Sequence, residues 1–148
     1  MLHTEVKSFE ELTTRELYEL LRLRSEVFVV EQDCVYQDID AKDANALHLM
    51  GTKNGELIAY ARIFKPGDYF EEAAIGRVAV KKDQRKVGYG KEIMKDALQA
   101  IDTRFNENAV RVSAQLYLER FYHELGFEQV GDGYLEDGIP HIAMVRNK

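Results

Sequence analysis

The sequence predicts an α+β fold in which helices flank a mixed, mostly antiparallel central sheet. The clearest evidence is Asn54-Gly55, the pair best suited to a tight hairpin, because both central residues of that turn take positive φ. The stretch 72–80 is an almost continuous apolar run, which is typical of a central strand covered on both faces. Other segments repeat apolar residues at helical spacing. Antiparallel strands and helices therefore share one core.

Each element has its own local pattern. Thr13 and Glu16 form a capping box, since each side chain can accept a free backbone N–H, and this predicts a helix from residue 14. An apolar stripe over 93–101 predicts a second helix, and Gly126 ends a third. A polar, acidic loop is expected at 35–46. The expected order is strand 3–9, helix 14–29, strands 47–53, 56–65 and 72–80, the helix containing 93–101, strand 109–114, helix 115–125 and strand 139–145.

Length, charge and composition exclude several classes of protein. With 148 residues and no internal repeat, the chain is expected to form a single domain over 1–148. A net charge of −6 argues against a nucleic-acid partner, because a phosphate backbone needs a positive surface. No apolar run approaches the roughly 20 residues that cross a bilayer, and the first residues lack a secretory pattern. We therefore expect no membrane partner and a cytoplasmic location, and the single cysteine, Cys34, excludes an internal disulfide.

The stretch VKKDQRKVGYGKEIM, from Val80 to Met94, concentrates basic residues and glycines between a strand and a helix. A loop in this position leaves backbone N–H groups unpaired near the positive end of the helix dipole, which suits an anion. Gly88 and Gly90 lack a Cβ and would let a phosphate approach the main chain. A solvated helix start, with glycines for the turn, explains the same spacing equally well.

Two common phosphate-binding motifs do not fit this turn. A P-loop requires Ser or Thr after Gly-Lys to bind magnesium, whereas Gly90-Lys91 is followed by Glu92. A dinucleotide-binding turn requires a third glycine, where this chain has Ile93, and repeated strand–helix–strand units that the hairpin excludes. The turn therefore predicts neither ATP with magnesium nor a dinucleotide, and we expect no metal.

Two motifs resemble those of the GNAT superfamily of acetyl-CoA-dependent N-acetyltransferases. The residues RKVGYG, at 85–90, match the R/Q-x-x-G-x-G/A pattern of that family and stand between a central strand and a central helix. The residues FYHELGF, at 121–127, are similar to the aromatic-Tyr-x-x-x-Gly-Phe segment near the family's C-terminal end. The stretches LRSEVFVVEQ and EDGIPHIAM further resemble the ElaA-like branch. The resemblance covers essentially the whole chain and implies a GNAT-type sheet.

The resemblance implies that acetyl-CoA binds at this turn. Its pyrophosphate would lie on the backbone N–H groups of 85–90, with positive charge from neighbouring basic side chains. Its pantetheine arm would pair, as an additional strand, with the main chain of Val78 and Val80, and the N–H of Ala79 or Val80 would stabilise the oxyanion. The implied cofactor-binding residues are Val78, Ala79, Val80, Arg85, Lys86, Val87, Gly88, Tyr89, Gly90 and Lys91.

Tyr122 occupies the family position of the acid that protonates the leaving sulfur. A phenol suits this role because its ordinary pKa, roughly 10, is not far above that of an alkyl thiol. A packing role beside Phe121 and Phe127 is the alternative. Many GNAT proteins also have an asparagine after the fifth strand, where this chain has Gln115, and the sequence leaves open whether Gln115 makes the same contact.

Three residues are candidates for the base that takes a proton from the attacking amine. Glu31 ends the first predicted helix, His141 follows Pro140 in the ElaA-like stretch, and His48 lies in an alternating strand. The structural alternatives are a solvent-facing carboxylate for Glu31 and a hydrogen-bonded sheet residue for His48. His48 is also a candidate contact to the acceptor.

Arg77 interrupts an apolar strand, and charges are rarely buried without a partner. It is a candidate ligand for a phosphate or carboxylate of the acceptor, and an ion pair with Glu31 or Asp40 is the alternative. The leading hypothesis is transfer of an acetyl group to a primary amine of a small molecule, such as an amino sugar phosphate. The competing hypotheses are a protein amine as acceptor and a CoA-binding sensor without activity. Dimers are common in the superfamily, which favours a homodimer.

Overall fold

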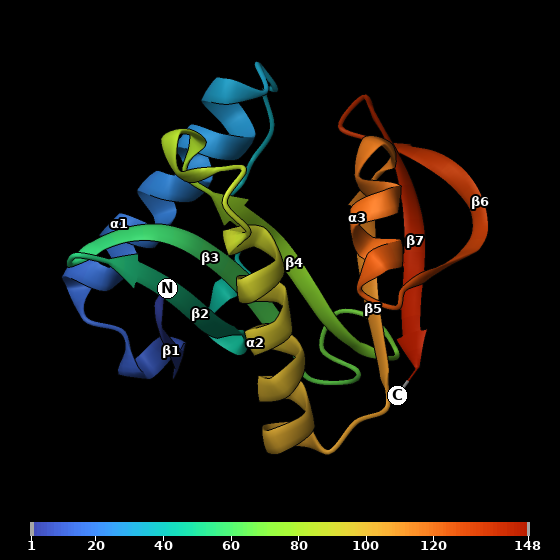
Figure 1. Ribbon diagram of the computed structural model, residues 1–148, viewed down its shortest axis with the longest axis horizontal. Helices are drawn as coiled ribbons and strands as arrows, with labels where there is room; N and C mark the ends of the chain where they lie inside the picture. Colours follow the sequence, from blue (N-terminus) through green and yellow to red (C-terminus); the bar gives the residue numbers. More distant parts are fainter. Residues whose placement is uncertain (1, 148) are drawn as a thin grey trace.

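The computed structural model describes residues 2–147, which form a seven-stranded sheet with the order β1-β2-β3-β4-β5-β7-β6 (Figure 1). Neighbouring strands are antiparallel except for β4 and β5, which are parallel. The predicted α+β fold with a mixed, mostly antiparallel sheet is therefore confirmed. The strands are β1 His3–Ser8, β2 Leu47–Lys53, β3 Glu56–Phe64, β4 Ala73–Val80, β5 Ala109–Gln115, β6 Glu128–Glu136 and β7 Ile139–Asn147.

Two long helices cover opposite faces of the sheet. Leu49, Ala59 and Ala61 face α2 (Tyr89–Phe105), whereas the intervening Met50 and Tyr60 face α1 (Thr14–Arg24), as the two-residue period of a strand requires. The short α3 (Glu119–Glu124) packs on the same side as α2. The remaining helical segments are η1 Phe9–Glu11, η2 Ser25–Glu31, η3 Asp43–Asn45, η4 Lys82–Gln84 and η5 Leu116–Leu118.

The sheet splits between β4 and β5. These strands pair only at Ala73 with Val110 and at Ala74 with Arg111, and beyond that point they diverge (Figure 1). A β-bulge accompanies the split, because Tyr60 pairs with Ala79 but Arg62 pairs with Gly76, so that β4 carries one residue more than β3. The C-terminal part of β4 is thus paired on one edge only, and its other edge is open.

Local sequence patterns predicted several elements accurately. Asn54 and Gly55 have φ values of 52° and 80°, as the predicted hairpin requires. The capping box also forms: the Glu16 N–H donates to Thr13 Oγ1 at 3.1 Å, and the Thr13 N–H donates to Glu16 Oε1 at 2.9 Å. Strand β4 has the predicted central position, with three strands on each side.

Three predictions needed correction. The helix expected over 14–29 is α-helical only to Arg24 and then widens into the π-helix η2. The helix expected over 115–125 begins with the 3-10 turn η5 before α3. Strand β6 was not predicted, because its residues are all exposed, Gly131 and Gly133 interrupt it, and a bulge lies between Val130 and Tyr134.

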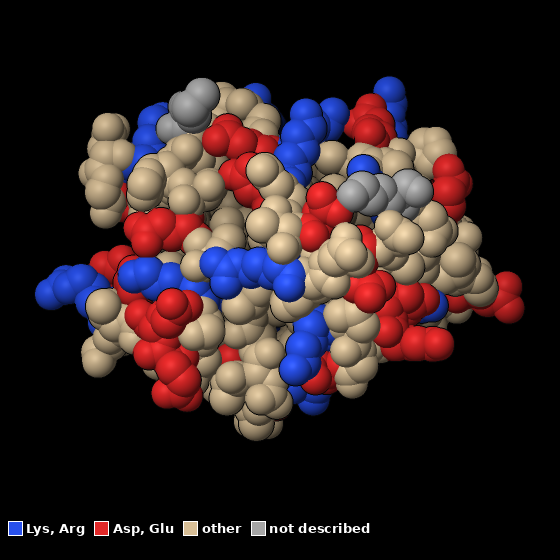
Figure 2. All heavy atoms as spheres, turned by 90° about the horizontal axis from the view of Figure 1, so that it is seen from below, with Lys and Arg blue, Asp and Glu red and all other residues tan. Residues whose placement is uncertain are grey.

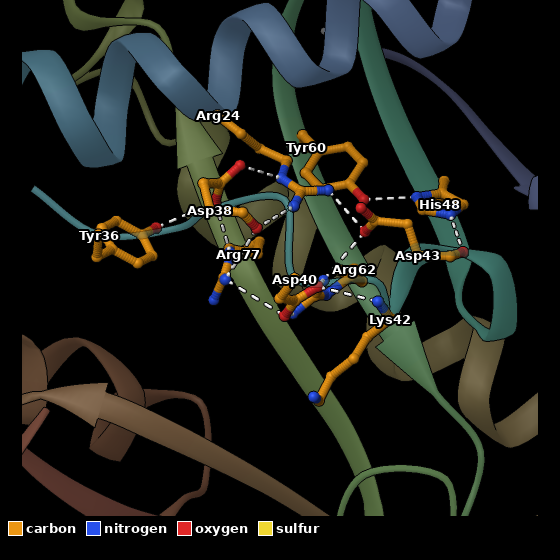
Figure 3. Close-up of polar contacts among 10 residues, drawn as sticks. All are labelled: Arg24, Tyr36, Asp38, Asp40, Lys42, Asp43, His48, Tyr60, Arg62 and Arg77. Carbon is orange, nitrogen blue, oxygen red and sulfur yellow. Dashed lines mark hydrogen bonds and ion pairs between the residues drawn. The ribbon is translucent and has the colours of Figure 1, made fainter. Parts of the chain in front are cut away.

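A buried network of ion pairs holds the loop between η2 and β2 (Figure 3). Arg24 is fully buried and donates to Asp38 and Asp43, and Arg62, 1% exposed, donates to Asp40 and Asp43. Charges this deep are tolerated only when they are paired and hydrogen-bonded. The network therefore fixes the acidic loop against α1 and β3.

Acidic and basic side chains are interspersed over the face shown in Figure 2, which carries no continuous basic surface. Among residues 2–147, the longest helix, α2, is neither long nor apolar enough to span a membrane, and the same holds for the others.

Candidate functional site

A cavity of about 950 Å³ lies where β4 and β5 diverge. Its walls come from η2 and the loop that follows it, the open edge of β4, the start of α2, β5, α3 and the β6–β7 turn. The two halves of the split sheet therefore contribute opposite walls.

The basic turn forms one end of this cavity. Gly88, the N-cap of α2, has a φ of 93°, and Lys86 has a φ of 71°. Within the described residues, the backbone N–H groups of 85–91 have no hydrogen-bond partner, although Glu92 N–H already donates to the Gly88 carbonyl. A Cβ on Gly88 would meet no atom within 4 Å, so the main chain is openly accessible there. These unpaired donors at a helix N-terminus can bind an anion.

Six of the seven residues predicted for this turn line the cavity: Arg85, Lys86, Gly88, Tyr89, Gly90 and Lys91. The exception is Val87, which is 67% exposed and lies outside the cavity. Arg85 is already engaged: its Nε donates to the Val80 carbonyl at 2.9 Å, and its guanidinium forms a two-point ion pair with Glu31. Arg85 therefore joins the turn to the end of β4 and to η2.

The open edge of β4 presents alternate residues to the cavity. The Lys81 N–H donates to the Ile58 carbonyl, so by alternation Ala79 bonds to β3 while Val78 and Val80 face the open edge. Both valines line the cavity, whereas Ala79 is buried in the core beneath α1. The N–H of Ala79 is thus turned away from the position expected for an oxyanion donor, and Val80 is left as the candidate.

Tyr122 projects from α3 into the cavity wall and is 6% exposed. Its ring packs edge-on against Phe121 and Phe127, with centroid distances of 5.1 and 5.8 Å. Among residues 2–147, its hydroxyl has no hydrogen-bond partner. Burial raises the pKa of the Tyr122 phenol, so it stays protonated at neutral pH and can donate.

The three candidate bases lie in different environments. Glu31 lines the cavity but is bound to Arg85. His48 is fully buried away from it, bonded through Nδ1 to the Tyr60 hydroxyl and through Nε2 to the Asp43 carbonyl, and burial lowers its pKa. His48 thus has the structural role, and its position supports neither proton transfer nor acceptor binding.

His141 lies in the cavity wall and is buried. Its Nδ1 is 2.7 Å from the Ile139 carbonyl, which can only accept, so Nδ1 carries the proton of the neutral ring. Its Nε2 is therefore an acceptor, and it lies 3.5 Å from Oε2 of Glu136.

Arg77 also lines the cavity, but its charge is matched by the acidic loop (Figure 3). Its Nε donates to Asp38 Oδ1 at 2.7 Å, and its Nη2 lies 3.4 Å from Asp40 Oδ2. Its guanidinium also stacks over Tyr36, 5.5 Å from the ring centroid. The ion-pair alternative therefore describes Arg77 as the structure shows it, because Nε and Nη2 of its guanidinium are held by the acidic loop.

Two amides connect the opposite walls. Gln115 Nε2 donates to Gln32 Oε1 at 3.2 Å, so the amide of Gln115 bonds across the cavity within the protein itself. Gln32 and Glu136 line the cavity but were not predicted to do so. Gln32 follows the end of the π-helix η2, and Glu136 ends the unpredicted strand β6. No sequence pattern indicates that either side chain faces the cavity.

Comparison with known proteins identifies the family. A family model described as an acetyltransferase (GNAT) domain matches residues 9–148. The chain is 46% identical to Protein ElaA of Escherichia coli over 138 residues, which cover 92% of this chain and 90% of that protein.

The chain belongs to the GNAT acetyltransferase family.

Two solved structures extend the comparison. An acyl-CoA N-acyltransferase from Pseudomonas aeruginosa superposes with a TM-score of 0.92 at 42% identity and covers 99% of each chain. A GNAT family acetyltransferase from Elizabethkingia anophelis with acetyl-CoA bound has a TM-score of 0.72 at 15% identity, covering 99% of this chain and 98% of that one, which shows the shared fold. The match to ElaA confirms the predicted ElaA-like branch of the GNAT family.

GNAT acetyltransferases use acyl-CoA, and the site is consistent with that ligand. The free N–H groups of 85–91 suit a pyrophosphate, and the open β4 edge suits an amide-containing arm. Within residues 2–147, no cluster of three or more His, Cys, Asp or Glu side chains is arranged to hold a metal.

Proposed function

We propose that this protein transfers the acetyl group of acetyl-CoA to the primary amine of a small molecule, by direct attack of the amine. One observation carries the proposal. Unpaired N–H groups at 85–91, the open edge at Val78 and Val80, and the side chains of Tyr122 and His141 all line the same cavity. The acetyl-CoA bound to the Elizabethkingia anophelis relative of the same fold supports acetyl-CoA as the donor.

The turn and the strand edge would position the donor. The N–H groups at the start of α2 would bind the pyrophosphate, aided by the helix dipole and by Lys86 and Lys91. The main chain of Val78 would bond to a pantetheine amide. The Val80 carbonyl already accepts from Arg85 Nε, and the Val80 N–H would stabilise negative charge that develops on the thioester oxygen. When bound, the acetyl thioester supplies the carbonyl carbon that the amine attacks.

His141 would take the proton from the incoming ammonium group. The bond from Nδ1 to the Ile139 carbonyl fixes the tautomer, so the lone pair on Nε2 is available to accept that proton. Of the three candidate bases, only His141 both lies in the cavity wall and has an accepting atom that no protein donor occupies. Glu31 accepts from Arg85 through both oxygens, and His48 lies outside the cavity.

Tyr122 would donate a hydrogen bond to the sulfur as the C–S bond breaks. Complete proton transfer from a phenol whose pKa is raised to a thiolate, whose conjugate acid has a pKa of about 8.5, is unfavourable. Stabilisation of the thiolate by a donated hydrogen bond is therefore the role that the buried hydroxyl fits best. The products are the N-acetyl amine, the CoA thiol and one proton.

The test is amine-dependent release of CoA thiol from acetyl-CoA by the purified protein. We expect Tyr122→Phe to lower kcat about ten- to hundredfold while CoA affinity, measured by calorimetry, stays nearly constant. Tyr18→Phe is the matched control, because Tyr18 is 71% exposed on α1 and lies outside the cavity. Tight CoA binding without thiol release on any amine would instead support the sensor hypothesis.

A further inference from the structure

The charges beyond the CoA turn indicate which acceptor the cavity admits. Of the cationic side chains in the wall, Arg85, Lys86 and Lys91 belong to that turn, which leaves Arg77. Arg77 is bound to Asp38 and Asp40, and Asp40 also holds Arg62. A phosphate or carboxylate on the acceptor would therefore meet an arginine whose charge is already balanced by Asp38 and Asp40.

The free charge on the opposite wall is negative. Glu136 points from β6 into the cavity, with Oε1 3.4 Å from the Ser113 hydroxyl and Oε2 3.5 Å from His141 Nε2. In the neutral tautomer fixed by the Ile139 carbonyl, Nε2 and Oε2 are both acceptors. In that tautomer no proton lies between them, and an ammonium group that donates to both atoms would satisfy the pair.

Aromatic side chains also line the cavity. Phe28, Tyr36 and Tyr69 belong to its wall, and Tyr36 is held in place by its hydroxyl, which donates to Asp38 at 3.0 Å. Aromatic rings accommodate alkyl chains and also attract cations to their faces. The wall thus suits an aliphatic body that carries positive charge.

We propose that the acceptor is an aliphatic amine without an anionic group, bound as its ammonium ion between Glu136 and His141. This inference rests on the proposed acetyl transfer and makes it more specific. It differs from the amino sugar phosphate expected from Arg77, because Asp38 and Asp40 already balance the charge of the guanidinium that would have held the phosphate.

Binding calorimetry tests the inference without requiring turnover. The protein, saturated with CoA, is titrated with 1,5-diaminopentane, with 5-aminopentanoate and with glucosamine 6-phosphate. We expect the diamine to bind at least about tenfold more tightly than either anionic probe, since each anion is repelled by Glu136 and finds Arg77 already paired. We expect Glu136→Gln to weaken diamine binding about tenfold, because the substitution keeps the shape and removes the charge.

Glu128→Gln is the matched control, since Glu128 is an exposed carboxylate on the same strand and lies outside the cavity. The inference is overturned if glucosamine 6-phosphate binds as tightly as the diamine, if no diamine binding is detected, or if Glu136→Gln and Glu128→Gln behave alike. Failure of the proposed function has a different signature: the diamine binds and depends on Glu136, but acetyl-CoA releases no thiol with any amine.

Discussion

At the residue scale, the two ring nitrogens of His141 have separate tasks. Nδ1 donates to the Ile139 carbonyl, and Nε2 is left to accept a proton in the cavity. If His141 is the base, His141→Gln should lower kcat/KM about a hundredfold near pH 7, a typical loss for a general base. Activity should recover as pH rises, because the amine then loses its proton to solvent.

A pH–rate profile of each variant measures this effect. Glu31→Gln provides the comparison, since Glu31 shares the cavity but is bound to Arg85. Alkaline recovery in Glu31→Gln, with an ordinary profile in His141→Gln, would assign the base to Glu31.

At the scale of elements, the turn before α2 depends on the positive φ of Gly88. An alanine there costs roughly 1–2 kcal/mol in backbone conformation, and relief of that strain would turn the neighbouring N–H groups away from a common point. We therefore expect Gly88→Ala to weaken CoA binding at least about tenfold.

Gly55→Ala separates this effect from general strain. Gly55 also has a positive φ, and a Cβ there would likewise meet no atom within 4 Å, but this glycine lies in the β2–β3 hairpin, outside the cavity. Urea denaturation should show similar losses of stability for the two variants, while calorimetry should show a loss of CoA affinity for Gly88→Ala alone. Equal CoA affinities would mean that the turn does not hold the pyrophosphate.

The elements that sequence predicted well are those with a local cause. The hairpin at Asn54-Gly55 follows from positive φ, and the start of α1 follows from the capping box at Thr13. Strand β6 has no such cause, because its stability comes from pairing with β7 and none of its residues is buried. The ion pair of Glu31 with Arg85 was equally hidden, since the two residues lie 54 positions apart in the chain. An ion pair of Arg77 with Asp40 was one of the alternatives that the sequence left open.

At the scale of the whole molecule, the buried ion network joins parts of the chain that are distant in sequence. Arg24 on α1, Arg62 on β3 and Arg77 on β4 all bind the loop containing Asp38 and Asp43 (Figure 3). That loop carries Tyr36 into the cavity wall. The stability of the fold and the shape of the cavity wall around Tyr36 therefore depend on the same charges.

Asp43 lies at the centre of this network, with Oδ1 2.7 Å from Arg24 and 3.0 Å from Arg62. Asp43→Asn leaves two buried guanidinium groups with less compensating charge, and we expect a loss of about 3 kcal/mol in the free energy of unfolding, measured in urea at pH 7. Glu72→Gln removes the carboxylate that pairs with Arg111. It should cost much less, because Glu72 is more exposed than Asp43.

The same network determines how stability depends on pH. Burial alone would raise the pKa of Asp40 and Asp43, but hydrogen bonds from Arg62 and Arg24 lower both, to about 2 for Asp40. A carboxylate whose pKa is lower in the folded state contributes stability above its unfolded pKa, about 3.9, and that contribution is lost as pH falls toward the folded value. The urea midpoint of the native protein should therefore fall steeply between about pH 4 and pH 2. Asp40→Asn should flatten this dependence, because one of the titrating carboxylates is gone, and an unchanged slope would show that the network does not control acid unfolding.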